Sequence, residues 1–180
     1  MKRAKLGDIF AFKTDAGFRI IILAYRVEKF GYFVRVLPGY YDAIPDNVLE
    51  LAKGECSFII STHINKLCSN GLLHYIGNLN TDSIPPMPDY DIDYTSYGDT
   101  GEFEVCEFSC PQNSFDFKGK PDGTGLPRRF KKLNLINGSV DPIWFIYLLV
   151  VGFDTKHWEL FAPGEKTYSE FYSKYRPLFK

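Results

Sequence analysis

Apolar and β-branched residues gather in three runs at the start of the chain. The runs cover residues 7–12, 18–27 and 30–37, and short polar breaks at residues 14–17 and 28–29 separate them. Runs of this length between such breaks are typical of consecutive antiparallel strands. The pattern therefore predicts a β-meander, which we expect to curl into the opening of a small half-open barrel.

The following segment has the pattern of a short helix and two further strands. The helix is expected from Asp46, which can cap its start, to Gly54, which can close its end. Residues 57–62 and 72–77 have the composition of strands. The turn-forming sequence at residues 69–71 predicts that these two strands pair with each other.

The middle of the chain is the least regular part. Within residues 82–101, the sequence Pro85-Pro86-Met87-Pro88 excludes a central strand or a helix. Residues 89–94 alternate acidic and apolar side chains, which predicts an edge strand with its carboxylates on one face. Strict alternation at residues 102–108 indicates a half-buried strand, and residues 115–118 and 130–136 are candidates for two more.

The last part of the chain predicts helices. Residues 143–151 follow a good helix start at Pro142, whereas their β-branched and aromatic content also suits a buried strand; we expect a helix. Thr167 and Glu170 form a capping box before aromatic residues at helical spacing, so a terminal helix should end near Pro177. The expected fold is one mostly β (α+β) domain over residues 1–180, with an antiparallel curled sheet or half-open barrel and two or three short helices.

Composition agrees with a single globular domain and narrows its partners. The chain has 180 residues, of which 17% are aromatic, and this aromatic content favours strands. Its net charge of −1 gives no global attraction to nucleic acid or to a membrane. The longest apolar run, from Ile143 to Gly152, is about half of a membrane span. The basic residues 1–5 precede no apolar signal core, so we expect a cytoplasmic protein.

Candidate catalytic and metal-binding motifs fail on their spacing. The four cysteines form no Cys-x-x-Cys pair, which favours reduced thiols over a disulfide or a metal site. Asp89, Asp91 and Asp93 begin like a calcium loop, but Tyr94 occupies the position that needs glycine and Thr100 the position that needs glutamate. The sequence therefore predicts no metal, no cofactor and no enzymatic activity.

Charge is segregated along the chain. From Cys68 to Phe117 there is no lysine or arginine, although this stretch holds nine acidic residues. They form either a solvated edge that prevents strand association or an acidic docking face for a basic protein. Tyrosines interspersed among the acids support the docking interpretation. The basic residues then follow in a cluster from 118 to 132, which suits a solvated loop or, with nearby phenylalanines, a site for single-stranded nucleic acid; they are Lys118, Lys120, Arg128, Arg129, Lys131 and Lys132.

The opening residues also suggest a family. Gly7-Asp8-Ile9-Phe10-Ala11-Phe12, then Asp15-x-Gly17-Phe18 and a strand ending in Tyr25-Arg26-Val27, resemble the start of immunity protein family 26 of bacterial polymorphic toxin systems. This resemblance implies a mostly β domain that binds and neutralises a toxin made by the same or neighbouring cells. With the acidic face, it leads to the expectation that a cognate, basic toxin contacts Asp89, Tyr90, Asp91, Asp93, Tyr94, Tyr97 and Asp99. The alternative is a single-stranded nucleic-acid-binding barrel that uses the cluster 118–132.

Overall fold

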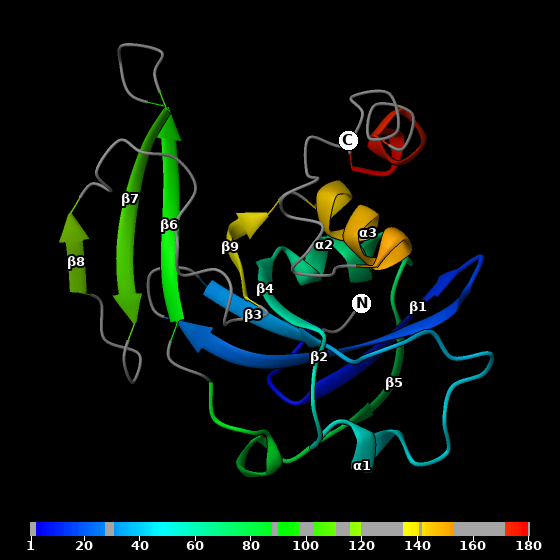
Figure 1. Cartoon of the computed structure of the whole chain (residues 1–180). Helices are drawn as coiled ribbons and strands as arrows, with labels where there is room; N and C mark the ends of the chain where they lie inside the picture. The colour runs from blue at the N-terminus through cyan, green and yellow to red at the C-terminus, as the bar shows by residue number, and fades with distance from the viewer. Residues whose placement is uncertain are drawn as a thin grey trace.

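In the computed structural model, the chain forms two β-sheets and several short helices (Figure 1). The described residues are 3–27, 31–87, 90–97, 103–110, 116–119, 135–140, 142–152 and 172–179. The larger sheet has the strand order β5-β1-β2-β3-β4-β9, and the smaller one has the order β6-β7-β8. This arrangement confirms the expected mostly β, α+β class.

Five strands of the larger sheet form its antiparallel core, and the sheet stays open instead of closing into a barrel. The predicted opening meander is confirmed, because β1 pairs with β2 and β2 pairs with β3. A sixth strand, β9, runs parallel to β4 at one edge. The strands are β1 (Asp8–Thr14), β2 (Gly17–Val27), β3 (Gly31–Val36), β4 (Phe58–Thr62), β5 (His74–Asn78) and β9 (Leu135–Val140).

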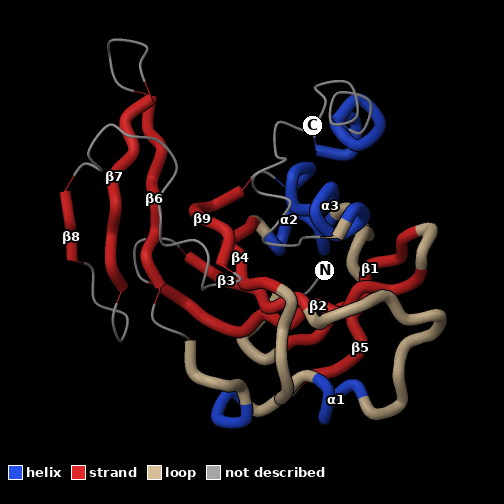
Figure 2. The backbone as a smooth tube through the Cα atoms, in the orientation of Figure 1, coloured by secondary structure: helices blue, strands red, loops and turns tan. Residues whose placement is uncertain are grey.

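Short helices cover both faces of this sheet (Figure 2). The apolar run that suited either a helix or a strand is the helix α3 (Pro142–Val151). The C-terminal helix is also present, since residues 172–175 are helical and continue into a 3-10 turn. The other elements are α1 (Val48–Leu51), α2 (Ile64–Ser69), the 3-10 turn η1 (Thr81–Ser83) and the C-terminal 3-10 turn η4 (Arg176–Phe179).

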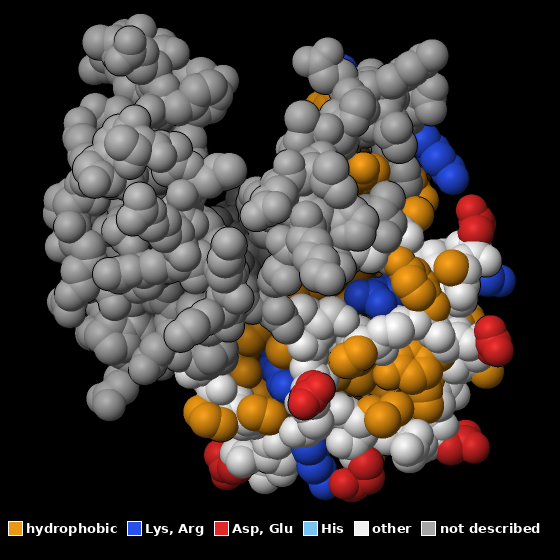
Figure 3. All heavy atoms as spheres, viewed as in Figure 1, with side chains coloured by type: hydrophobic (Ala, Val, Ile, Leu, Met, Phe, Trp, Pro, Cys, Tyr) orange, Lys and Arg blue, Asp and Glu red, His pale blue; other side chains and the backbone are white. Residues whose placement is uncertain are grey.

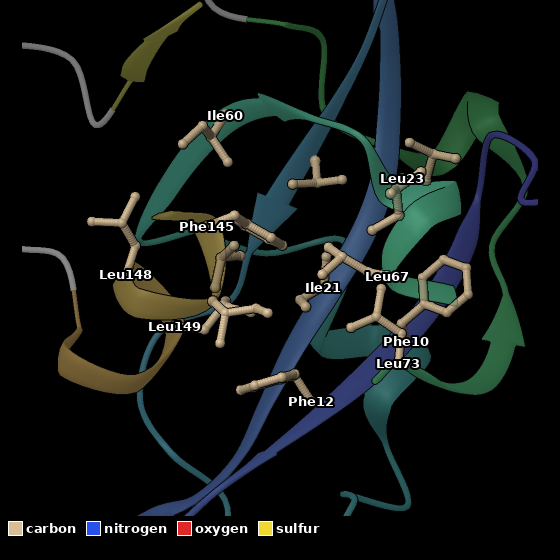
Figure 4. Close-up of a cluster of buried hydrophobic side chains, with 14 of the residues drawn as sticks. Phe10, Phe12, Ile21, Leu23, Ile60, Leu67, Leu73, Phe145, Leu148 and Leu149 are labelled. Carbon is tan, nitrogen blue, oxygen red and sulfur yellow. The ribbon is translucent and has the colours of Figure 1, made fainter. Parts of the chain in front are cut away.

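The core has two layers because alternate residues of each strand point to opposite faces. On one face, side chains of β1–β4 pack against α2 and α3; those labelled in Figure 4 include Phe10, Ile21, Leu67 and Phe145. On the other face, strand residues such as Ile22 pack against α1 and the segment that follows β5. Burial on both faces explains why β2 has an almost continuous apolar sequence.

Two local predictions were wrong. The strand at residues 72–77 pairs with β1, not with β4, because α2 lies between β4 and β5 in the chain. Asp46 does not cap α1; Asn47 is at the N-cap position, and its side chain makes no capping hydrogen bond. The strand expected at residues 130–136 overlaps β9 (Leu135–Val140), and its first five residues lie outside the described part of the chain.

The smaller sheet confirms three of the later strands. It consists of β6 (Tyr90–Tyr97), β7 (Phe103–Cys110) and β8 (Asp116–Gly119), all antiparallel. As expected, β6 lies at an edge of this sheet. Of the helices in the described ranges, none has the length and apolar character to cross a bilayer.

Candidate functional site

The predicted acidic face falls on β6 and its neighbours. β6 pairs with β7 along its whole length, and Asp91 and Asp93 occupy positions on the same face. Directly opposed residues of an antiparallel pair also share a face, so Glu107, which pairs with Asp93, joins them. Asp116 of β8 pairs with Ser109 and occupies the same face. We call these four positions, Asp91, Asp93, Glu107 and Asp116, the acidic face.

The pairing divides the tyrosines that the sequence grouped with these carboxylates. Tyr97 occupies the same face as Asp91 and Asp93, whereas Tyr90 and Tyr94 occupy the opposite one. A flat partner surface that covers the carboxylates therefore also covers the position of Tyr97. The same surface cannot contact Tyr90 and Tyr94, whose positions are on the opposite face. Asp89 and Asp99 lie outside the described residues.

The opposite face of this sheet is mostly apolar by position. Ile92 shares it with Tyr90 and Tyr94, and Phe108 and Phe117 form a directly opposed pair on it. A sheet with one apolar and one charged face ordinarily packs the first against protein and turns the second outward. The acidic face is thus the one suited to a charged partner.

The basic cluster cannot be assembled as a site from the described part of the chain. Lys118 lies in β8, where the pairing with β7 shifts register between Glu107 and Phe108. The other five basic residues, from Lys120 to Lys132, lie outside the described residues. The nucleic-acid alternative stays a prediction.

Sequence reasoning missed two buried arginines in the larger sheet. They are Arg19 on β2 and Arg35 on β3, and each is only 3% exposed. Both lie within apolar strands, where a single arginine is usually interpreted as part of a solvent face. Arg35 stands in an almost unbroken apolar run, and that position is the signal that could have indicated a buried cation.

Arg19 holds the chain that leaves β3. Its Nη1 donates to the carbonyl oxygen of Gly39, and its guanidinium lies 4.7 Å from the centre of the Tyr40 ring. The Tyr40 hydroxyl in turn donates to the carbonyl oxygen of Val150 near the end of α3, at 2.9 Å. Burial lowers the pKa of Arg19, and the nearby Tyr40 and Tyr41 partly oppose this shift.

Arg35 holds the other end of the same connection. Its Nη1 donates to the carbonyl oxygen of Ala52 at 2.9 Å, and its Nη2 donates to that of Gly54 at 2.5 Å. These carbonyls follow the last residue of α1, where backbone acceptors have no partner within the helix. Arg35 therefore fixes the end of α1 against β3.

Together the two arginines secure residues 37–57, which we call the clamped connection. Phe18 and Tyr41 form an antiparallel β-bridge, in which each backbone N–H donates to the carbonyl oxygen of the other residue. The N···O distances are 2.7 and 3.0 Å. Within the described part of the chain, neither guanidinium forms a salt bridge, and the Nε of each is buried without a hydrogen-bond partner. Burying a charge is costly, and the carbonyl hydrogen bonds of both guanidiniums, with the Tyr40 ring beside Arg19, offset part of this cost.

A tyrosine lies near Arg35. The Tyr25 hydroxyl donates to the carbonyl oxygen of Pro85 at 2.8 Å. Burial raises the pKa of Tyr25 to about 12, an effect that the positive charge of Arg35 partly offsets. Tyr25 is therefore a neutral hydrogen-bond donor that ties the segment after η1 to β2.

The described residues contain no group of three or more His, Cys, Asp or Glu side chains that could hold a metal ion. Comparison with known proteins adds no relative, since the chain matches no protein-family model, no curated protein and no solved structure. The candidate sites therefore rest on the geometry of this chain alone.

Proposed function

We propose that this chain is an immunity-type protein that binds and neutralises a basic protein toxin through the acidic face. The observation that carries the proposal is the pairing of Asp93 with Glu107, two acidic residues directly opposite each other. Like charges directly opposite each other destabilise a sheet. A positively charged partner would relieve this repulsion when it binds, and that relief would contribute to the free energy of binding.

The chemistry of the face suits recognition of a basic surface. Asp91 and Asp116 extend the negative charge across all three strands. Complementary charge accelerates encounter and suppresses wrong partners more than it raises final affinity. Tyr97, at a position on the same face, adds a residue type that is enriched in protein interfaces. The resemblance of residues 7–27 to immunity protein family 26 supports a toxin as the partner.

The test is the association rate with the polypeptide encoded next to this gene, measured by stopped flow at low and moderate salt. The double variant Asp91→Lys/Asp93→Lys should slow association about tenfold or more at low salt, because it reverses the sign of the local field. Asp15→Lys, an exposed acid in the β1–β2 turn, is the matched control and should change the rate little.

An unchanged rate in the double variant would exclude the acidic face as the toxin contact. If the wild type does not bind the neighbouring polypeptide at all, the toxin assignment itself is wrong. Titration with a single-stranded oligonucleotide then tests the alternative, for which affinity should fall steeply as salt rises.

A further inference from the structure

We propose that the outer surface of the clamped connection is a second docking surface, suited to an arginine-bearing segment of a basic protein. It lies on the larger sheet, apart from the acidic face, and does not depend on the toxin assignment. This surface has exposed apolar side chains, an acidic border and a backbone that is fixed before binding.

The clamped connection exposes large apolar side chains to solvent. Tyr40 is 36% exposed and Leu49 is 44% exposed, and they are two of the four large hydrophobic residues exposed in the described part of the chain. Tyr41 and Ile44 are half-buried beside them in the chain. Figure 3 shows hydrophobic side chains gathered over the connection between β3 and α1, with acidic side chains at the border. Apolar patches with a polar rim commonly mark interaction sites.

The negative charge at the border of this surface indicates a positively charged partner. Four carboxylates of the connection are exposed, and they belong to Asp42, Asp46, Glu50 and Glu55. Lys53 is the single basic residue between residues 37 and 57, so four negative charges against one positive leave −3. Lys53 is also engaged, since its Nζ lies 2.8 Å from Glu50. A partner that covers this surface must bring positive charge.

Among the described residues, no ion pair joins these carboxylates to the buried arginines of the connection. Arg19 and Arg35 lie beneath the same connection, each with its Nε unpartnered. A carboxylate turned inward would offset the cost of burying either guanidinium. All four instead remain exposed to solvent, where they add little to folding. Their exposed position agrees with a role in contact with another molecule.

The clamp also lowers the cost of binding. Arg19 fixes Gly39, the Phe18–Tyr41 bridge fixes the next residues, and Arg35 fixes the end of α1. A surface that is already ordered loses less conformational entropy on association. Arginine suits it better than lysine, because a planar guanidinium can pair with a carboxylate through two hydrogen bonds and stack on a tyrosine ring.

The experiment is a titration of the ¹⁵N-labelled full chain with a short oligoarginine peptide and, separately, with oligolysine of the same length. The expected amide shifts are saturable and concentrate at residues 40–50, and oligoarginine binds more tightly than oligolysine. Asp42→Asn/Asp46→Asn should weaken oligoarginine binding about fivefold. Asp82→Asn, an exposed acid of η1 outside the connection, is the control and should leave the affinity unchanged.

Three results would overturn the proposal. One is the absence of saturable binding. The second is a set of shifts spread over exposed carboxylates in general, with Asp82→Asn weakening binding as much as the double variant. The third is a set of shifts confined to β6 and β7, which would favour the acidic face and exclude the clamped connection.

Discussion

Gly17 controls how closely the clamped connection approaches β2, and its replacement gives the sharpest test of the fold. Its φ of +125° is a backbone conformation that residues with a Cβ rarely adopt. A methyl group added there would lie 2.7 Å from the carbonyl oxygen of Tyr41, closer than real contacts allow. Gly17→Ala must therefore strain the backbone and push Tyr41 away from Phe18.

The magnitude follows from these two effects. The backbone strain costs on the order of 1–3 kcal/mol. Loss of both hydrogen bonds between Phe18 and Tyr41 adds about 0.5–1.5 kcal/mol each. We expect Gly17→Ala to lower the free energy of unfolding by about 2–6 kcal/mol. Gly39→Ala is the matched control, because Gly39 has a φ of +76° but no atom within 4 Å of an added methyl; it should cost about 1–2 kcal/mol.

Urea unfolding of the two variants separates the effects. Both substitutions reduce the entropy of the unfolded chain similarly, so the difference between them reports the collision with Tyr41. Hydrogen exchange should accelerate at the Phe18 and Tyr41 amides in Gly17→Ala only. If the two variants lose equal stability, within about 0.5 kcal/mol, the close approach of Tyr41 to Gly17 is not what holds the connection.

Two further predictions concern the neighbours of this connection. Arg35→Met keeps most of the side-chain length but leaves the carbonyl of buried Ala52 without its donor, so unfolding in urea should show a loss of about 1–3 kcal/mol; unchanged or higher stability would mean that the charge itself costs as much as the bonds contribute. The pKa of Tyr25 is higher in the folded state than its usual value of 10, so its contribution to stability is full below pH 10 and is lost as pH rises toward 12. The free energy of unfolding should fall over this range in wild type, and the Tyr25→Phe variant should show a shallower fall; equal slopes would contradict the assignment.

The opening of the fold could be predicted because its signals are local. Each strand of the β1–β3 meander is a continuous apolar run with a turn at its end, and neighbouring runs pair in sequence order. The helix α3 could be predicted from Pro142 at its start. These features need no information about the rest of the chain.

The wrong pairing of β5 shows where local signals fail. Residues 69–71 resemble a hairpin turn, but they follow α2, whose buried Ile64, Leu67 and Cys68 recur at helical spacing. A helix between two strands removes the tight connection that a hairpin needs, and β5 then pairs with β1 instead. This helical spacing was present in the sequence, and it indicated that a helix separates the two strands.

The candidate sites were only partly predictable. Alternation placed Asp91 and Asp93 on one face, but Glu107 and Asp116 join them through cross-strand register, which depends on pairs distant in sequence. The burial of Arg19 and Arg35 depends on carbonyl oxygens supplied by residues about 20 positions away. No periodicity within a strand can indicate such partners.

The path of the chain between the two edges of the larger sheet has a consequence for divergence. The chain leaves that sheet after β5 at one edge, forms β6, β7 and β8, and re-enters as β9 at the other edge. None of the four pairings among the five antiparallel strands involves a residue of this excursion. Descendants of one ancestor can therefore diverge in the excursion while they inherit the same antiparallel strand pairings.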